Sequence, residues 1–148
     1  MSEAIRYIGI ARKAGAVDIG ETNSGAAVRA GKARLLILAA DASDNARRRA
    51  ENFVYGTDTP LVRVPYSKEE LTDITGVAGC SMAAFTDTGL ASAFMSDLSK
   101  NNEGFSEVAS QLELLDKKQR KLRTERIAHE RNKALGKSNA SGKRRKTK

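Results

Sequence analysis

The sequence is poor in the side chains on which metal sites, disulfide scaffolds and thiol or histidine catalysis depend. Cys80 is its one cysteine, which excludes an intramolecular disulfide and a cysteine-based zinc cluster, and we expect a buried, inert thiol. The one histidine, His129, lies in a charged segment without a catalytic neighbour, so we expect a solvated surface side chain. Helix capping explains the carboxylates of Asp41, Asp44 and Asp87. We therefore expect no catalytic residue, no metal and no cofactor.

Long apolar runs and aromatic clusters are also missing. No window approaches the roughly 18 uncharged apolar residues of a membrane span, and the N-terminus, MSEAIRYIG, has no signal-like apolar core. Tryptophan is absent, and three Tyr and four Phe make up the aromatic residues, so we do not expect a platform on which nucleic-acid bases stack. We expect a cytoplasmic protein with no membrane partner, which would recognise a nucleic acid by shape and phosphate.

Positive charge is concentrated at the C-terminal end of the chain. The formal net charge is +8, yet residues 1–116 hold 12 Lys/Arg against 16 Asp/Glu, a net of −4. Residues 117–148 hold 14 Lys/Arg against Glu125 and Glu130, a net of +12. The basic segment could bind a polyanionic partner through its positive charge. The rest of the chain could bind such a partner only through a local, shaped patch.

The first hundred or so residues alternate helix-like and strand-like segments, which is typical of an α/β domain. The run 34–40, RLLILAA, is almost continuously apolar, as expected for a central strand with both faces covered. Capping residues and glycine stops mark the ends of the helices, with Thr22 or Asn23 as the expected cap of the second. We predict helices over residues 3–14, 22–30, 41–55, 67–76 and 87–99, and strands over 16–19, 34–40, 61–64 and 81–85. This order predicts a three-layer α/β/α sandwich with a four-stranded mixed sheet.

A polar break at 100–104 separates this domain, residues 1–100, from a different C-terminal part. Residues 105–135 are rich in helix-forming residues and carry an apolar stripe, which predicts a long charged helix. The stripe comprises Val108, Leu112, Leu115 and Leu122. Residues 136–148, GKSNASGKRRKTK, are rich in Gly, Ser and Lys and are expected to form a disordered basic tail.

The stretch 20–27, GETNSGAA, has the glycine spacing of a phosphate-binding P-loop, GxxxxGK[ST]. Ala26 and Ala27 stand where the lysine and the hydroxyl of that motif should be, so the stretch lacks the groups that select a nucleoside triphosphate. Two interpretations stay open. Either a helix N-terminus is presented to an anion, such as a nucleic-acid phosphate, or this is a tight strand-to-helix turn without a ligand.

Four segments resemble, in this order, the small ribosomal proteins that bind RNA kink-turns, the L-seven-Ae and L-thirty-e family. They are GIARKAGAVDIGE, AAVRAGKARLLILAADASDNARRR, PLVRVPYSKEEL and TGVAGCSMAAFTDTGLA. The closer likeness is to the bacterial, ribosome-associated branch of that family, and its most specific piece is residues 31–43. The resemblance covers nearly all of residues 3–99 and implies an α/β/α sandwich that grips a sharply bent RNA.

In that family the RNA lies across a glycine-rich loop and the start of the following helix, and a second loop of small residues abuts the bent strand. The resemblance therefore implies two RNA-binding surfaces here. The first comprises Gly20, Glu21, Thr22, Asn23 and Ala26, and the second Val77, Ala78, Gly79 and Cys80. Thr22 and Asn23 replace the family's typical Asn-Glu pair and lack the carboxylate that accepts two donors from a guanine. Ala26 replaces its usual lysine.

Further cations are candidates for the same edge, although each would otherwise be an ordinary solvated charge. They are Arg12, Lys13, Arg29, Lys32 and Arg34. The run 47–49, RRR, points to several sides of one helix and is expected to be a solvated surface. The basic tail is expected to add phosphate contacts through Lys143, Arg144, Arg145 and Lys146.

We therefore expect a non-enzymatic RNA-binding protein, ribosomal or ribosome-associated, with structured, kink-turn-like RNA as its partner and ribosomal RNA as the leading candidate. A second hypothesis is a protein-interaction adaptor that has lost RNA specificity and docks Leu112, Leu115 and Leu122 on a partner helix. We expect no oligomer, but one that did form would use residues 105–125. A third hypothesis is a degenerate nucleotide-binding enzyme.

Overall fold

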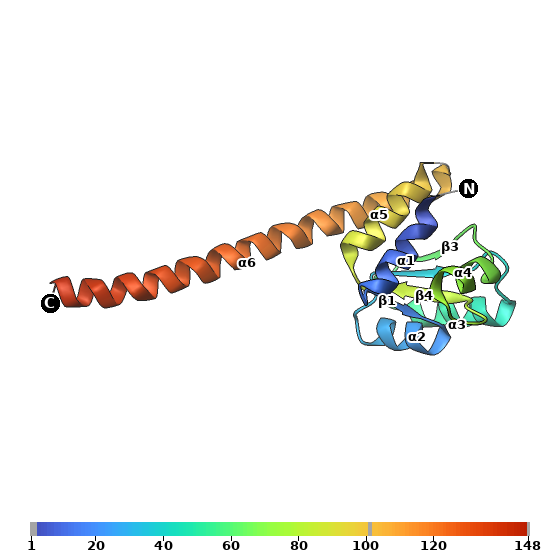
Figure 1. Ribbon diagram of the computed structural model, residues 1–148, viewed down its shortest axis with the longest axis horizontal. Coiled ribbons are helices and arrows are strands. Elements are labelled where there is room, and N and C mark those ends of the chain that lie inside the picture. The colour runs from blue at the N-terminus through green and yellow to red at the C-terminus, as the bar shows by residue number, and fades with distance from the viewer. Residues whose placement is uncertain (1–2, 101, 148) are drawn as a thin grey trace. The chain divides into compact units, whose positions relative to one another are not determined.

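Four short strands form one mixed sheet in the order β1-β4-β2-β3 (Figure 1). In the computed structural model, residues 3–100 and 102–147 are described, with the side chains of 4–100 and 102–132. β4 (Met82–Phe85) is antiparallel to both β1 (Val17–Ile19) and β2 (Leu35–Leu38), and β2 is parallel to β3 (Leu61–Arg63). The predicted mixed sheet of four strands is confirmed.

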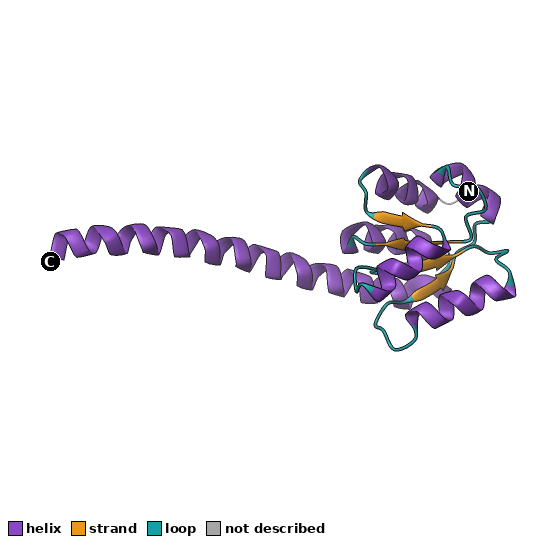
Figure 2. Cartoon of the chain, turned by 90° about the horizontal axis from the view of Figure 1, so that it is seen from below, coloured by secondary structure: helices purple, strands orange, loops and turns teal. Residues whose placement is uncertain are grey.

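Helices cover both faces of the sheet (Figure 2). Alternate residues of the central strands therefore enter two separate cores. Leu36 and Ala84 face α2 (Glu21–Arg29) and α3 (Asp44–Val54), which lie together below the sheet in Figure 1. Residues one position along, such as Ile37, face the other layer. That layer consists of α1 (Arg6–Lys13), α4 (Lys68–Thr75) and α5 (Thr88–Ser99). The three-layer α/β/α sandwich is therefore confirmed.

Most helix starts follow the capping signals in the sequence. Ser67 and Glu70 form a reciprocal capping box at α4, and Asp87 Oδ2 accepts from Leu90 N at 2.9 Å at the start of α5. Asp41 caps a different helix from the expected one, because its Oδ1 accepts from Lys68 N at 2.8 Å. A 3-10 turn, η1 (Glu3–Ile5), precedes α1 within the first predicted helix.

The cap of α2 differs from the prediction. α2 begins at Glu21, with Gly20 as its cap, rather than at Thr22 or Asn23. Gly20 has a φ of 94° and a ψ of 164°, a backbone conformation that side chains with a Cβ rarely adopt. The Asn23 side chain bonds to the preceding strand instead, with Nδ2 donating to Ile19 O at 3.0 Å.

The C-terminal helix, α6 (Ser106–Thr147), follows a 3-10 turn, η2 (Glu103–Phe105), and is longer than predicted. Residues 136–147, expected to be disordered, belong to this helix; no proline follows Pro65 to break it. Lys148 lies outside the described residues. No described helix is both long and apolar enough to span a membrane.

The chain divides into two compact units, unit 1 (Met1–Glu113) and unit 2 (Leu114–Lys148). Ala109 and Leu112, from the first turns of α6, are buried in the core that the sheet shares with α1, α4 and α5. Part of the apolar stripe therefore completes the folded domain.

Candidate nucleic-acid interface

The turn from β1 into α2 presents an uncapped helix N-terminus. Gly20 N donates to Met82 O at 3.0 Å, which anchors the turn to the first residue of β4. The first bond of the helix runs from Ser24 N to Gly20 O at 2.9 Å, so the preceding N–H groups have no acceptor within the helix. Glycine has no side chain to cap them. This arrangement suits an anion, because the N–H groups and the positive end of the helix dipole point outward together.

The exposed side of this helix start carries uncharged side chains. Thr22, Asn23 and Ala26 are exposed, and the bond from Asn23 to Ile19 O holds the amide in place while leaving its Oδ1 as an acceptor. Glu21 is paired with Arg49 of α3, whose Nη1 lies 2.5 Å from Glu21 Oε1. The pair neutralises the one carboxylate of the first turn.

The second predicted surface lies beside the first. The loop between α4 and β4 exposes Val77, Ala78 and Gly79, while Cys80 at its end is 1% exposed. Burial raises the pKa of the Cys80 thiol, and hydrogen bonds with Thr75 and the backbone of Met82 and Gly20 act in the opposite direction. Because the thiol touches Gly20, it joins the loop to the start of α2. The Cys80 thiol is buried, as predicted, so Cys80 positions the edge and offers no exposed side chain to a ligand.

Arg12 is the predicted cation that borders this loop. A Cβ added to Gly76 would lie 3.4 Å from Arg12 Nη2, so the guanidinium lies against the end of α4 where the loop begins. Lys13 is exposed in the last turn of α1, and none of the described contacts ties its side chain to the loop. We call the surface formed by residues 20–23, residues 76–79 and Arg12 the loop edge.

Arg29, Lys32 and Arg34 do not border the loop edge, which corrects the sequence-based expectation. Gly20 bonds to Met82 at the start of β4, whereas Arg34 N donates to Phe85 O at its end, at 2.7 Å. These cations thus lie at the opposite end of α2 from Gly20, because the helix runs between the two positions.

The P-loop-like spacing of GETNSGAA has a packing explanation. A Cβ on Gly25 would lie 2.6 Å from the Phe53 ring of α3, so the second glycine permits close approach of the two helices. The first glycine provides the positive φ of the cap. Neither the Gly25–Phe53 contact nor the Glu21–Arg49 pair could be found from the sequence, since both join segments 28 residues apart.

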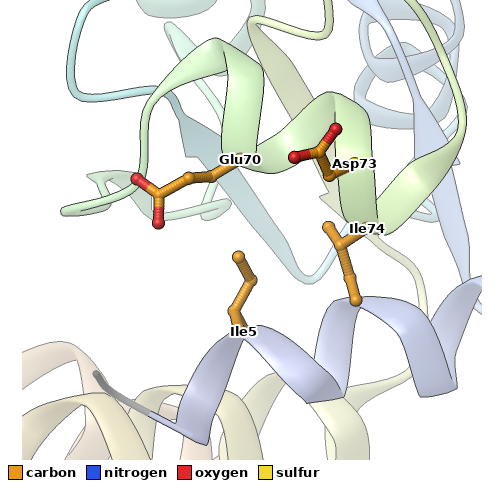
Figure 3. A pocket seen from close by; sticks show the side chains of 4 residues that line it. All are labelled: Ile5, Glu70, Asp73 and Ile74. Carbon is orange, nitrogen blue, oxygen red and sulfur yellow. The ribbon is translucent and has the colours of Figure 1, made fainter.

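A hollow of about 250 Å³ lies outside the loop edge, between η1 and α4 (Figure 3). Ile5 and Ile74 give it apolar walls, while Glu70 and Asp73 bring carboxylates that would repel a phosphate. Within the described residues, no three His, Cys, Asp or Glu side chains gather in a way that could hold a metal ion.

Unit 2 supplies positive charge along α6. Lys118, Lys121 and Arg123 are exposed, and Arg120 Nη2 lies 3.0 Å from Asp116 Oδ2. The predicted contacts at Lys143, Arg144, Arg145 and Lys146 fall in the part of α6 whose side chains lie outside the described residues.

Comparisons with known structures agree with the sandwich architecture. The chain is similar to a protein of unknown function from Bacillus halodurans, with a TM-score of 0.60 and 20% identity over 67% of this chain and 99% of that chain. It is also similar to the Giardia lamblia 15.5kD RNA binding protein, with a TM-score of 0.54 and 22% identity over 68% of this chain and 85% of that chain. At these identities the likeness establishes a shared fold. No family model and no curated protein matches the sequence.

Proposed function

We propose that this chain is a non-enzymatic protein that binds structured RNA of the kink-turn class, as a member of the L-seven-Ae and L-thirty-e family. The observation that carries the proposal is the meeting of residues 20–23 and 76–79 on one edge, joined through Gly20, Met82 and Cys80. The sequence resemblance implies RNA contact at residues 20–23 and 26 and at residues 77–80, so both implied surfaces overlap the loop edge. The shared fold with an RNA-binding protein from Giardia lamblia supports the same assignment.

The chemistry of the loop edge fits a bent RNA backbone. The N–H groups at the start of α2 can donate to a phosphate, and the small side chains of Ala78 and Gly79 let a strand approach the loop closely. Arg12 supplies a guanidinium at the border. Asn23 Oδ1 can accept one donor from a base edge, which is less than a carboxylate would accept. The edge therefore recognises shape more strongly than sequence.

The basic C-terminal segment adds affinity in this proposal. Residues 117–148 carry a net charge of +12, and contact with about six to ten phosphates would give log K a slope of about −4 to −9 against log salt. We propose a ribosomal or ribosome-associated role in the cytoplasm, with ribosomal RNA as the partner.

A comparison of two RNAs with the full chain tests the proposal. A kink-turn RNA should bind more tightly than an RNA in which the internal loop is replaced by paired bases, because only the bent strand fits the loop edge. Asn23→Ala should weaken kink-turn binding by about 1 kcal/mol, roughly fivefold, through loss of the amide acceptor. Asn45→Ala, at an exposed site on α3, is the matched control. Equal affinity for both RNAs would reject the proposed function.

An adaptor function has one observation in its favour. Leu114, Leu122 and Ile127 of α6 are 68%, 58% and 52% exposed, which leaves apolar side chains on this helix available to a partner. The burial of Leu112 removes one member of the predicted docking stripe, so the remaining surface is smaller than expected. Concentration-dependent self-association that Leu122→Asp abolishes, measured by sedimentation, would favour this function over RNA binding.

A further inference from the structure

Arg29, Lys32 and Arg34 form a second cationic surface, which we call the α2 C-terminal patch. α2 contains nine residues, so the patch lies about 13 Å from Gly20 along the helix. The sheet also separates the two surfaces, because the backbone of Gly20 bonds to the first residue of β4 and that of Arg34 bonds to its last residue. The patch and the loop edge are therefore two distinct surfaces.

The charges of the patch are not neutralised by carboxylates. The Arg29 guanidinium lies 5.7 Å from the centre of the Phe53 ring, and Arg34 Nη1 donates to Gly31 O at 3.4 Å. Among the residues whose side chains are described, neither these two cations nor Lys32 forms an ion pair.

Two neighbouring arginines of α3 are paired with carboxylates. Arg47 lies 3.3 Å from Glu51, and Arg49 is paired with Glu21. Acidic residues outnumber basic ones in residues 1–116, so carboxylates are not scarce in this part of the chain. Cations left unpaired in such surroundings create a local positive surface that a polyanion can use.

The helix dipole does not account for the whole patch. A cation in the last turn of a helix is stabilised by the negative end of the dipole, and this explains Arg29. The effect falls off within that turn, whereas Lys32 and Arg34 come after the C-cap, Ala30. The dipole therefore does not account for Lys32 and Arg34, and among the residues whose side chains are described no carboxylate pairs with either charge.

The backbone that carries the patch is held firmly. Lys32 N and Ala33 N both donate to Ala27 O, at 3.0 and 3.2 Å, and Thr59 Oγ1 donates to Ala33 O at 3.3 Å. Gly31 closes the turn with a φ of 72°. A preformed surface loses less conformational entropy on binding than a mobile one, which favours its use as a contact site.

We propose that the α2 C-terminal patch binds the phosphate backbone of a second segment of the bound RNA, so that the folded domain contacts RNA at both ends of α2. The inference rests on the proposed function and names a contact outside the loop edge. Lysine and arginine meet phosphates without reading bases, so the patch adds affinity and orientation but no sequence preference.

Salt dependence of binding by the full chain tests this contact. The variant Arg29→Gln/Lys32→Gln/Arg34→Gln loses three cations from the patch, and Arg48→Gln/Arg63→Gln/Lys68→Gln loses the same charge from scattered sites on α3, β3 and α4. The probe is a kink-turn RNA with long flanking stems, titrated at salt concentrations between about 50 and 200 mM. We expect the patch variant to reduce the slope of log K against log salt by about 2 to 3, and the control variant by less than about 1.

Equal slopes for the two triple variants would overturn the inference, since the charge would then act only through the overall field. Lys32→Gln alone, compared with Arg63→Gln, provides a second test if a triple variant loses its thermal unfolding transition; here the expected reduction is about 1. Binding of kinked and straight RNA by the wild-type chain distinguishes a failure of this inference from a failure of the proposed function. If it binds kinked and straight RNA equally, the kink-turn assignment fails, while a patch-specific change in slope still supports RNA contact at the patch.

Discussion

Lysine at position 26 should strengthen binding to a kink-turn RNA if the loop edge faces the RNA. Ala26 is exposed on α2, and Thr22 and Asn23 lie four and three positions before it. Residues at these spacings share one side of a helix, so a lysine introduced at position 26 would project beside the two polar side chains of the edge. The substitution Ala26→Lys therefore places one positive charge next to the expected path of the strand.

The size of the gain follows from counterion release. One additional phosphate contact changes the slope of log K against log salt by about −0.9. At about 0.1 M salt this change corresponds to about eightfold tighter binding. Fixing a long side chain opposes this gain by about 0.5 kcal/mol or more. We expect a net increase of about threefold, with a steeper salt dependence.

The assay compares Ala26→Lys with Ser96→Lys in fluorescence titrations of a labelled kink-turn RNA. Ser96 is exposed on α5, in the layer on the other face of the sheet, so the control adds the same charge away from the edge. Ser96→Lys should leave affinity nearly unchanged because solvent and salt screen a distant surface charge. Equal affinities for the two variants would refute the placement of RNA across the start of α2.

Three further predictions concern the thiol, the first turns of α6 and unit 2. Burial raises the pKa of the Cys80 thiol, so the stability that the buried thiol contributes is complete below the pKa of the unfolded chain and is lost as pH rises through the pKa of the folded chain. Urea titrations should therefore show weaker stability at alkaline pH. Labelling of the thiol by iodoacetamide should be no faster than unfolding. Leu112→Ala should destabilise the domain by about 2 to 5 kcal/mol in urea titrations, whereas Leu122→Ala should change stability by less than about 0.5 kcal/mol, because Leu112 is 1% exposed and Leu122 is 58% exposed. Deleting residues 114–148 should flatten the salt dependence of RNA binding while preserving the thermal unfolding transition, since Ala109 and Leu112 stay in place; an unchanged salt slope would contradict the role given to unit 2.

The sequence predicts the sheet well because the information is local. The run that forms β2 is apolar at every position, which is typical of a strand covered on both faces, and all four of its residues are buried. The capping box of Ser67 and Glu70 likewise appears in the sequence at the required spacing and forms as predicted.

The sequence predicts the ends and partners of helices less well, because these depend on distant residues. Whether Leu112 packs on the domain or on a partner cannot be read from its spacing, and the structure places it in the core. Gly20, rather than Thr22 or Asn23, caps α2 because its φ of 94° fits the turn that the bond to Met82 imposes.

In the candidate site, too, some features follow from the sequence and others only from the three-dimensional fold. The resemblance groups residues 20–23 with 77–80, and the structure brings these segments together at one edge. Proximity in the chain makes Arg29, Lys32 and Arg34 look like members of that edge. The direction of α2 carries them to its other end, which only the three-dimensional fold reveals.

Crosslinking of the full chain to RNA in growing cells, with the crosslinked peptides and the bound RNA both sequenced, would show which residues touch RNA. We expect crosslinks within residues 20–34 and 76–81, together with others in α6, on RNAs that form a kink-turn. Crosslinks confined to residues 114–148 would contradict this expectation, because the folded domain would then have no contact with RNA.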